Sequence, residues 1–316
     1  MKRIKGLVAL LLAVLFVSAT LAACGGDNAT TETTETTTET TTETTETTTE
    51  ETTNAPAEGL DEQILVVSRE DGSGTRTAFT EITGVMKDDV DNTLAQAQIS
   101  QGTNEVITFV STAKAAIGYI SLGSLNDTVK AVDIDGVQAT AEDVNSGAYK
   151  IARPFNICYK DGQLSKEAQD FINFIHSVEG QEVVEAEGYI KVSGEGNYHN
   201  TEKLTGKVTV EGSTSVGPVM AKIAEAYNAL QPDVVIEIQE NGSSAGVKAA
   251  IEGGAEIGMA SRELKDTELA EVKGEVIAQD GIAVIVNKEN PVSNLTIDEV
   301  RQIFVGEIGN WNEVGK

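Results

Sequence analysis

The sequence has few of the residues that build metal centres and nucleophilic active sites. Its 316 residues include two histidines, His176 and His199, and two cysteines, Cys24 and Cys158. With Cys158 as the single cysteine after Cys24, the chain has neither a disulfide framework nor a cysteine metal cluster. It also lacks a His-Glu-x-x-His motif and the Gly-Lys-Ser/Thr of a nucleotide-binding loop. We therefore do not expect a histidine-based metal site or catalytic triad.

Positive charge is also scarce. The chain has 23 Lys and Arg against 50 Asp and Glu, which gives a formal net charge of −27 at pH 7. Nucleic acids and anionic membrane surfaces are themselves negatively charged, so neither is expected as a partner. A small anion is not excluded, because a few backbone N–H groups and one or two arginines decide the local potential.

The N-terminal segment has the organisation of a secretory signal. Three basic residues precede an apolar run over residues 7–17, which is too short to span a membrane. Residues 21–24, Leu-Ala-Ala-Cys, resemble a bacterial lipobox. The resemblance implies that a signal peptide, residues 1–23, is removed and that Cys24 is lipidated. A plain signal peptide with an incidental cysteine is the alternative.

Residues 30–53 consist of seventeen threonines and seven glutamates and nothing else. Such a segment has no apolar surface to offset the entropy cost of ordering, and its charges repel one another. We expect residues 24–58 to form a disordered tether between a membrane and a folded body.

The folded body is predicted to be an α/β structure with mostly parallel sheets. From residue 59 to residue 316 about 258 residues remain, which are enough for two lobes. Runs of β-branched residues, such as 64–67, 207–210 and 234–239, alternate with stretches of helical periodicity. This alternation is typical of strands that are joined by crossover helices.

The loop over residues 68–76 has the composition of an anion site. Ser73, Gly74 and Thr75 precede the predicted helix, so their backbone N–H groups and the positive end of the helix dipole point at one place. Arg69 adds a forked cation, and Asp71 is placed to hold that cation. A strand–turn–helix with an ordinary cap is the alternative for this loop alone.

The same pattern recurs at residues 211–218 and 241–246. Both are loops rich in Gly, Ser and Thr between a predicted strand and a predicted helix. In open α/β sheets such loops gather beyond the carboxyl ends of the strands, where ligands bind. Three such loops, together with Arg69, favour convergence on one small oxyanion.

These loops resemble those of a known family, the phosphate-binding lipoproteins of ABC phosphate importers (PstS-type, with the type II periplasmic-binding-protein fold). The matching stretches are residues 68–76, 116–123, 211–218, 242–248, 260–264, 280–286 and 310–315. The resemblance implies two α/β lobes with a ligand cleft between them. It further implies an extracytoplasmic monomer that hands inorganic phosphate to the membrane permease subunits of an ABC importer. Such a receptor breaks no bond, so we expect that the protein is not an enzyme and has no cofactor, no metal and no catalytic residues.

The resemblance also assigns the phosphate contacts, all of them in the loops that match. They are Arg69, Ser73, Gly74, Thr75, Thr214, Ser215, Ser243, Ser244, Ser261 and Arg262. Asp71 is assigned to orient Arg69. Arg262 is a departure, because well-known members have an Asp there that accepts the proton of protonated phosphate. Discrimination against sulfate then depends on another carboxylate, Asp71 or Glu263, or is weaker.

The order of the motifs is a second departure. In the family the stretch that matches residues 68–76 follows the stretch that matches residues 310–315. Here residues 68–76 come first in the folded body, and residues 310–315 come last. We therefore predict a circular permutation with residues 193–207 as the new connection; a fragment of a tandem duplication is the alternative. The predicted lobes are 59–126 plus 280–316, and 127–279, with crossovers near Asn126–Val132 and Ile277–Gly281.

Two other functions remain open at this point. One is a receptor of the same fold for another oxyanion, such as sulfate, molybdate or tungstate. The other is a sensory or surface module that uses the same two lobes.

Overall fold

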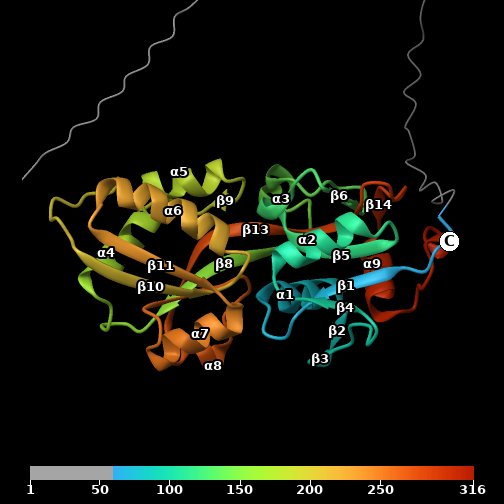
Figure 1. Cartoon of the computed structure of the whole chain (residues 1–316), viewed down its shortest axis with the longest axis horizontal. Helices are drawn as coiled ribbons and strands as arrows, with labels where there is room; N and C mark the ends of the chain where they lie inside the picture. Colours follow the sequence, from blue (N-terminus) through green and yellow to red (C-terminus); the bar gives the residue numbers. More distant parts are fainter. Residues whose placement is uncertain (1–59) are drawn as a thin grey trace, which may run out of the picture. The chain divides into compact units, whose positions relative to one another are not determined.

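The structure is a computed structural model, and it describes residues 60–316 (Figure 1). The predicted signal peptide, the lipidation of Cys24 and the predicted tether lie outside the described residues. Within residues 60–316 no helix is long and apolar enough to cross a membrane.

A single long strand, β13 (Lys273–Asn287), runs through both halves of a ten-stranded sheet. The half that contains β1 (Leu65–Arg69) is called the first sheet below, and the half that contains β10 (Gly206–Gly212) the second sheet. Its first half pairs antiparallel with β8 (Ala152–Tyr159), up to the pair Gly281 and Ala152. Its second half pairs antiparallel with β5 (Ala116–Ser121), beginning at Ile282 and Ser121. Figure 1 shows β13 running from one sheet to the other. This strand therefore joins the two halves of the described body.

The first sheet is built around β1, which lies between two parallel neighbours. Its strands are β1 (Leu65–Arg69), β4 (Gln98–Ser100), β5, β6 (Val129–Ala131) and the second half of β13. Its helices are α1 (Gly74–Thr83), α2 (Thr103–Thr112), α3 (Ala141–Ser146) and α9 (Ile297–Val305). Short pairs are β2 (Met86–Lys87) with β3 (Val90–Asp91), and β7 (Asp133–Ile134) with β14 (Asn294–Leu295). Single 3₁₀ turns lie at Leu122–Ser124 and Trp311–Glu313.

The second sheet has β10 between two parallel neighbours. Its strands are β10 (Gly206–Gly212), β11 (Val234–Glu240), β12 (Ile257–Ala260), β8, β9 (Ile190–Lys191) and the first half of β13. Its helices are α4 (Lys166–Ile175), α5 (Val178–Ala186), α6 (Gly217–Leu230), α7 (Ser243–Glu252) and α8 (Asp266–Leu269). The strand order across both halves is β11-β10-β12-β8-β13-β5-β1-β4, with β6 and β9 also paired to β13.

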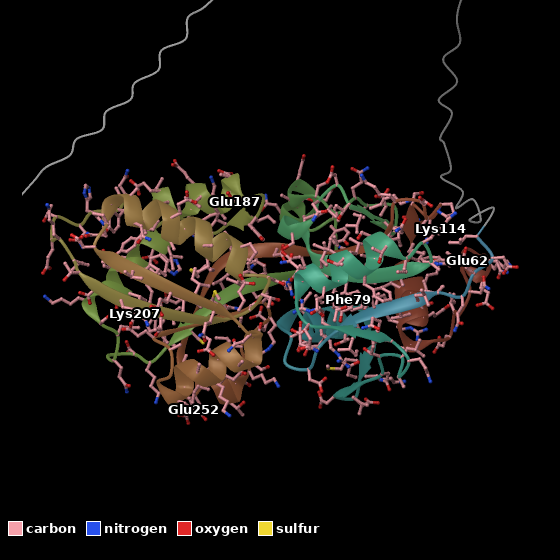
Figure 2. The ribbon with its side chains drawn as sticks, viewed as in Figure 1. Glu62, Phe79, Lys114, Glu187, Lys207 and Glu252 are labelled. Atoms are coloured by element: carbon pink, nitrogen blue, oxygen red, sulfur yellow. The ribbon has the colours of Figure 1, made fainter. Side chains whose placement is uncertain are left out.

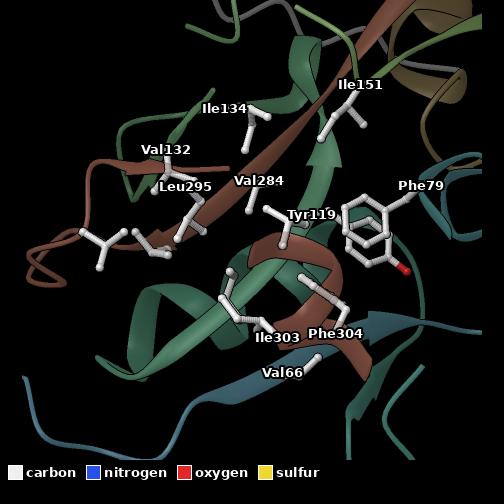
Figure 3. Packing of buried hydrophobic residues seen from close by; sticks show 14 of the residues in the cluster. Val66, Phe79, Tyr119, Val132, Ile134, Ile151, Val284, Leu295, Ile303 and Phe304 are labelled. Atoms are coloured by element: carbon white, nitrogen blue, oxygen red, sulfur yellow. The ribbon is translucent and has the colours of Figure 1, made fainter. Parts of the chain in front are cut away.

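Each sheet has its own apolar core. In the first core the Phe79 ring stacks on Tyr119 with centroids 3.9 Å apart, and Phe304 meets Phe79 edge-on at 4.7 Å (Figure 3). In the second core Phe171, Phe174 and Tyr227 pack together. Figure 2 shows charged side chains such as Lys207 and Glu252 pointing outward. The expected α/β architecture is confirmed, although β13 pairs antiparallel with both β8 and β5.

The predicted crossover near Asn126–Val132 does not agree with this packing. β6 pairs with the second half of β13, and Val132 and Ile151 belong to the first core. Phe155 belongs to the second core, so the chain passes between the cores within β8. Periodicity marks residues 127–151 as short strands and a helix, but it does not say which sheet they join. The other predicted crossover, Ile277–Gly281, coincides with the change of core along β13.

The first and last segments of the described chain lie side by side. Gln63 forms an antiparallel bridge with Asn310, and Trp311 N donates to Glu62 O at 3.1 Å. Asn312 Nδ2 donates to Asp61 Oδ1 at 2.6 Å. The Trp311 side chain is fully buried in the first core. Figure 2 shows Glu62 at this end of the first sheet.

Candidate functional site

Loops from both sheets meet beyond the carboxyl ends of their strands. β1 leads into α1, β10 into α6 and β11 into α7, as the three loops predict. Contact between the loops is direct, because Ser244 N donates to Gly72 O at 3.1 Å. A Cβ on Gly74 would overlap Ser243 Oγ and come within 2.8 Å of Ser261 Oγ. The small size of Gly74 is therefore required for this approach.

Arg69 supplies a buried cation at the end of β1. It is the last residue of β1 and is 1% exposed. Its Nε and Nη2 donate to the two carboxylate oxygens of Glu70 at 2.8 and 2.7 Å, and Nη2 also donates to Thr214 Oγ1 at 2.9 Å. Its Nη1 is buried without a hydrogen-bond partner. A buried cationic donor of this kind is costly to leave unpaired, so it marks a place for an acceptor.

The residue that orients Arg69 is Glu70, and the assignment of this role to Asp71 is wrong. The Asp71 side chain is fully exposed and pairs with Arg76 Nη1 at 3.1 Å. Glu70 instead accepts from Nε and Nη2 of Arg69 with its two carboxylate oxygens, and Oε2 also accepts from Gly102 N at 3.1 Å. Burial would raise the pKa of Glu70, but the bonds and charge of Arg69 outweigh this effect and the pKa is lowered. Glu70 is therefore an anion that fixes the guanidinium.

The start of α1 brings its hydroxyls to the second sheet. Ser73 is the N-cap and its Oγ accepts from Arg76 N at 3.3 Å, so this hydroxyl is committed to the helix. Thr75 is 1% exposed, and its Oγ1 lies 2.9 Å from Ser215 Oγ. Ser215 N donates to Ser213 Oγ at 3.2 Å, which holds the loop after β10 in place.

The serines of the third and fourth loops form a second group of hydroxyls. Ser261 N donates to Ser243 Oγ at 3.1 Å, and the two hydroxyl oxygens lie 3.3 Å apart. Both residues are 1% exposed. Ser244 is exposed and contacts Gly72, so its side chain lies at the edge of this group. The structure thus brings together most of the predicted contacts, around Arg69 and Gly74.

Arg262 is not one of them, and its predicted contact with the anion is contradicted. Its Nη1 and Nη2 donate to the carboxylate of Glu268 on α8, both at 2.8 Å. Nη1 also donates to Glu263 O at 2.9 Å. Arg262 is 2% exposed, and its guanidinium is committed to these acceptors. The sequence places Arg262 directly after Ser261, but the side chain turns toward α8.

Two residues near the site were not predicted. Arg153 on β8 donates from Nη1 to Ser261 O at 3.0 Å and is paired with the buried Asp280 at 3.0 Å. Thr103, the first residue of α2, has its Oγ1 3.4 Å from the hydroxyl oxygens of Thr214 and Ser215. A signal for Thr103 was present, because Gly102-Thr103 before a helix repeats the composition of the other loops.

The arrangement is suited to binding an anion. It combines hydroxyl groups from both sheets, the starts of α1 and α7, and one unpaired guanidinium N–H. Within residues 60–316 no three His, Cys, Asp or Glu side chains are grouped to hold a metal ion.

Comparisons with known proteins agree with this fold. A family model described as a PBP superfamily domain matches residues 49–179 and 198–316. The "Phosphate-binding protein PstS 2" of Streptococcus agalactiae serotype V is 48% identical over 259 residues, which are 80% of this chain and 88% of that protein. The "Phosphate-binding protein PstS" of Bacillus subtilis is 32% identical over 131 residues, 40% of this chain and 44% of that protein.

A solved structure is similar over the same extent. The crystal structure of a phosphate-binding protein of a phosphate ABC transporter from Streptococcus pneumoniae TIGR4 is 47% identical, with a TM-score of 0.65. The similarity covers 80% of this chain and all of that one. The chain thus has the fold of the substrate-binding proteins of transporters, and it is not an enzyme. It belongs to the PBP superfamily domain family and, within it, to the PstS-type phosphate-binding proteins.

Proposed function

We propose that this protein is an extracytoplasmic receptor that binds inorganic phosphate at Arg69 and delivers it to an ABC importer. The observation that supports this function best is the buried Nη1 of Arg69, which has no partner although Nη2 of the same guanidinium donates to the Thr214 hydroxyl of the second sheet. A tetrahedral oxyanion supplies acceptor oxygens to such donors in several directions. The relatives named above are phosphate-binding proteins, and one is described as part of a phosphate ABC transporter.

Calorimetric titration of the folded body with phosphate tests this function. We expect phosphate to bind to one site per chain, and excess sulfate, molybdate or tungstate to compete weakly. Tight binding of one of these anions in place of phosphate would make the protein a receptor for that anion. No binding of any of them would refute the site.

The selectivity for phosphate is proposed to depend on Glu70. With Asp71 in solvent and Arg262 paired to Glu268, Glu70 is the carboxylate in contact with Arg69. A carboxylate beside the anion repels sulfate, whereas protonated phosphate has a proton to donate. In a Glu70→Gln variant the phosphate-to-sulfate affinity ratio is therefore expected to fall. An unchanged ratio would remove Glu70 from this role.

We propose further that the protein is anchored to the cell membrane through lipidated Cys24, with residues 24–58 as the tether. This proposal is based on the sequence at residues 1–53. Mass spectrometry of the N-terminal peptide from membranes should show an acylated cysteine. A Cys24→Ala variant should leave the membrane fraction, and a variant that stays there would contradict the anchor.

The motif order is proposed to be a circular permutation of the family order. Its support is the pairing of residues 61–64 with 309–312, since ends that were once joined should lie together. A protein with Lys316 joined to Asp61 by a short linker, and new ends opened within 193–207, should fold and bind phosphate with unchanged affinity. Failure of this protein to fold would favour the tandem fragment.

A further inference from the structure

The hydroxyl of Thr103 has no close partner although it is buried. Thr103 is 4% exposed, and its Oγ1 lies 3.4 Å from both Thr214 Oγ1 and Ser215 Oγ. Hydrogen bonds between hydroxyl groups are usually about 2.7–2.8 Å long, so both contacts are at the weak limit. Thr75 reaches the same Ser215 hydroxyl at 2.9 Å. The Thr103 hydroxyl is therefore positioned at the site without being well satisfied there.

Its position is fixed by the same carboxylate that fixes Arg69. Glu70 Oε2 accepts from Arg69 Nε at 2.8 Å and from Gly102 N at 3.1 Å. Gly102 has a φ of 95° and is the N-cap of α2, so Thr103 follows directly from this anchored turn. Glu70 thus holds both the guanidinium and the start of α2 against the loop after β10.

A second, independent observation at the same place is the unpaired Nη1 of Arg69. Nη2 of that guanidinium contacts Thr214 at 2.9 Å, and Thr103 contacts the same hydroxyl. The guanidinium of Arg69, with its unpaired Nη1, and the weakly bonded hydroxyl of Thr103 therefore both lie beside the Thr214 side chain. One anion beside Thr214 would accept from both Arg69 Nη1 and Thr103 Oγ1, while Arg69 Nη2 keeps its bond to Thr214.

We propose that Thr103 is a further phosphate-binding residue, whose hydroxyl donates to an oxygen of the anion bound by Arg69. This inference rests on the proposed function and extends its site to the start of α2. The first sheet then supplies three side chains to the anion, Arg69, Thr75 and Thr103. A hydroxyl bond to a charged oxygen is stronger than the two long contacts that it replaces.

The test compares Thr103→Val, which removes the hydroxyl at nearly constant volume, with Thr103→Ser, which keeps it. Thr108→Val on the same helix is the control, because the Thr108 hydroxyl is exposed and bonds to Asn104 O at 2.8 Å. Calorimetric titration with inorganic phosphate should give a Kd about tenfold higher for Thr103→Val, the ratio expected for one bond to a charged acceptor. Thr103→Ser and Thr108→Val should remain within about threefold of wild type.

Three results separate the inference from the function on which it rests. A Thr103→Val protein that binds phosphate like wild type, or a Thr103→Ser protein as weak as Thr103→Val, would overturn the role of this hydroxyl. If the wild-type protein itself does not bind phosphate, the proposed function fails. Thr103→Ala replaces Thr103→Val if urea unfolding shows that valine disrupts the fold, and the same rise in Kd is expected of it.

Discussion

Replacing Arg69 with Ala should weaken phosphate binding by about 2–4 kcal/mol, or roughly 30-fold to 900-fold. The bonds of Arg69 to Glu70 and Thr214 are present without a ligand, so they contribute little to the difference between the bound and free states. The direct loss is the bond from Nη1, the one nitrogen that has no partner. A hydrogen bond to a charged acceptor contributes about 1.5–3 kcal/mol.

The rest of the expected loss comes from Glu70. In the wild-type protein its charge is compensated by the Arg69 guanidinium at 2.7 Å, whereas in Arg69→Ala it stands alone near a bound anion. Like charges about 6 Å apart repel by up to about 3 kcal/mol at an effective dielectric constant of 20, and solvent reduces this value. A double variant, Arg69→Ala with Glu70→Gln, should therefore bind phosphate more tightly than Arg69→Ala alone.

Calorimetric titration of wild type, both variants and an Asp71→Asn control gives these differences directly. Asp71→Asn should bind phosphate within about twofold of wild type, because this side chain points to solvent and contacts Arg76. Urea unfolding checks that each protein is folded. A folded Arg69→Ala protein with wild-type affinity would show that the unpaired nitrogen is not the anion contact. A double variant no tighter than Arg69→Ala would refute the repulsion argument.

The sequence was sufficient to predict the loops of the site because their chemistry is local. A strand, a short run of Gly, Ser and Thr and a helix place backbone N–H groups and hydroxyls at a helix start wherever they occur. Ser73 accordingly caps α1, whereas α1 and α7 begin earlier than the pattern predicts, so Thr75 and Ser243 lie in the first turns of these helices. Because neighbouring strands run parallel, the loops that follow them lie at the same edge of the sheet. This meeting of the loops cannot be read from any one loop alone.

The partners of the two arginines could not be predicted in this way. Glu70 and Asp71 are neighbours in sequence, and which of them faces Arg69 depends on the end of β1 and on the position of Gly102 in space. Arg262 likewise follows the site serine, but the nearest buried acceptor is Glu268, six residues further on. Long side chains select partners by tertiary packing, so adjacency in sequence is a poor guide to their contacts.

Three further predictions concern residues around the site and beyond it. Gly74→Ala should weaken phosphate binding in titration, because the added methyl would displace the Ser243 hydroxyl from the site, and unchanged binding would contradict this close approach. A hydrogen bond from His176 lowers the pKa of Glu275 to about 2 from its ordinary 4.5, so this carboxylate stabilises the fold at higher pH and the contribution is lost as pH falls through about 2. The difference in unfolding free energy between wild type and Glu275→Gln should accordingly shrink as the pH falls from 4.5 to about 2. A constant difference would contradict the pairing of Glu275 with His176. Arg262→Met should lower the free energy of unfolding by about 2 kcal/mol, because it leaves a mostly buried carboxylate on α8 without its cation. It should leave the phosphate-to-sulfate affinity ratio unchanged, since the guanidinium bonds to α8 and to a main-chain carbonyl rather than to the hydroxyls around Arg69. A changed ratio in a folded variant would show that the side chain leaves α8 for the anion, and the assignment of its partner would then be wrong.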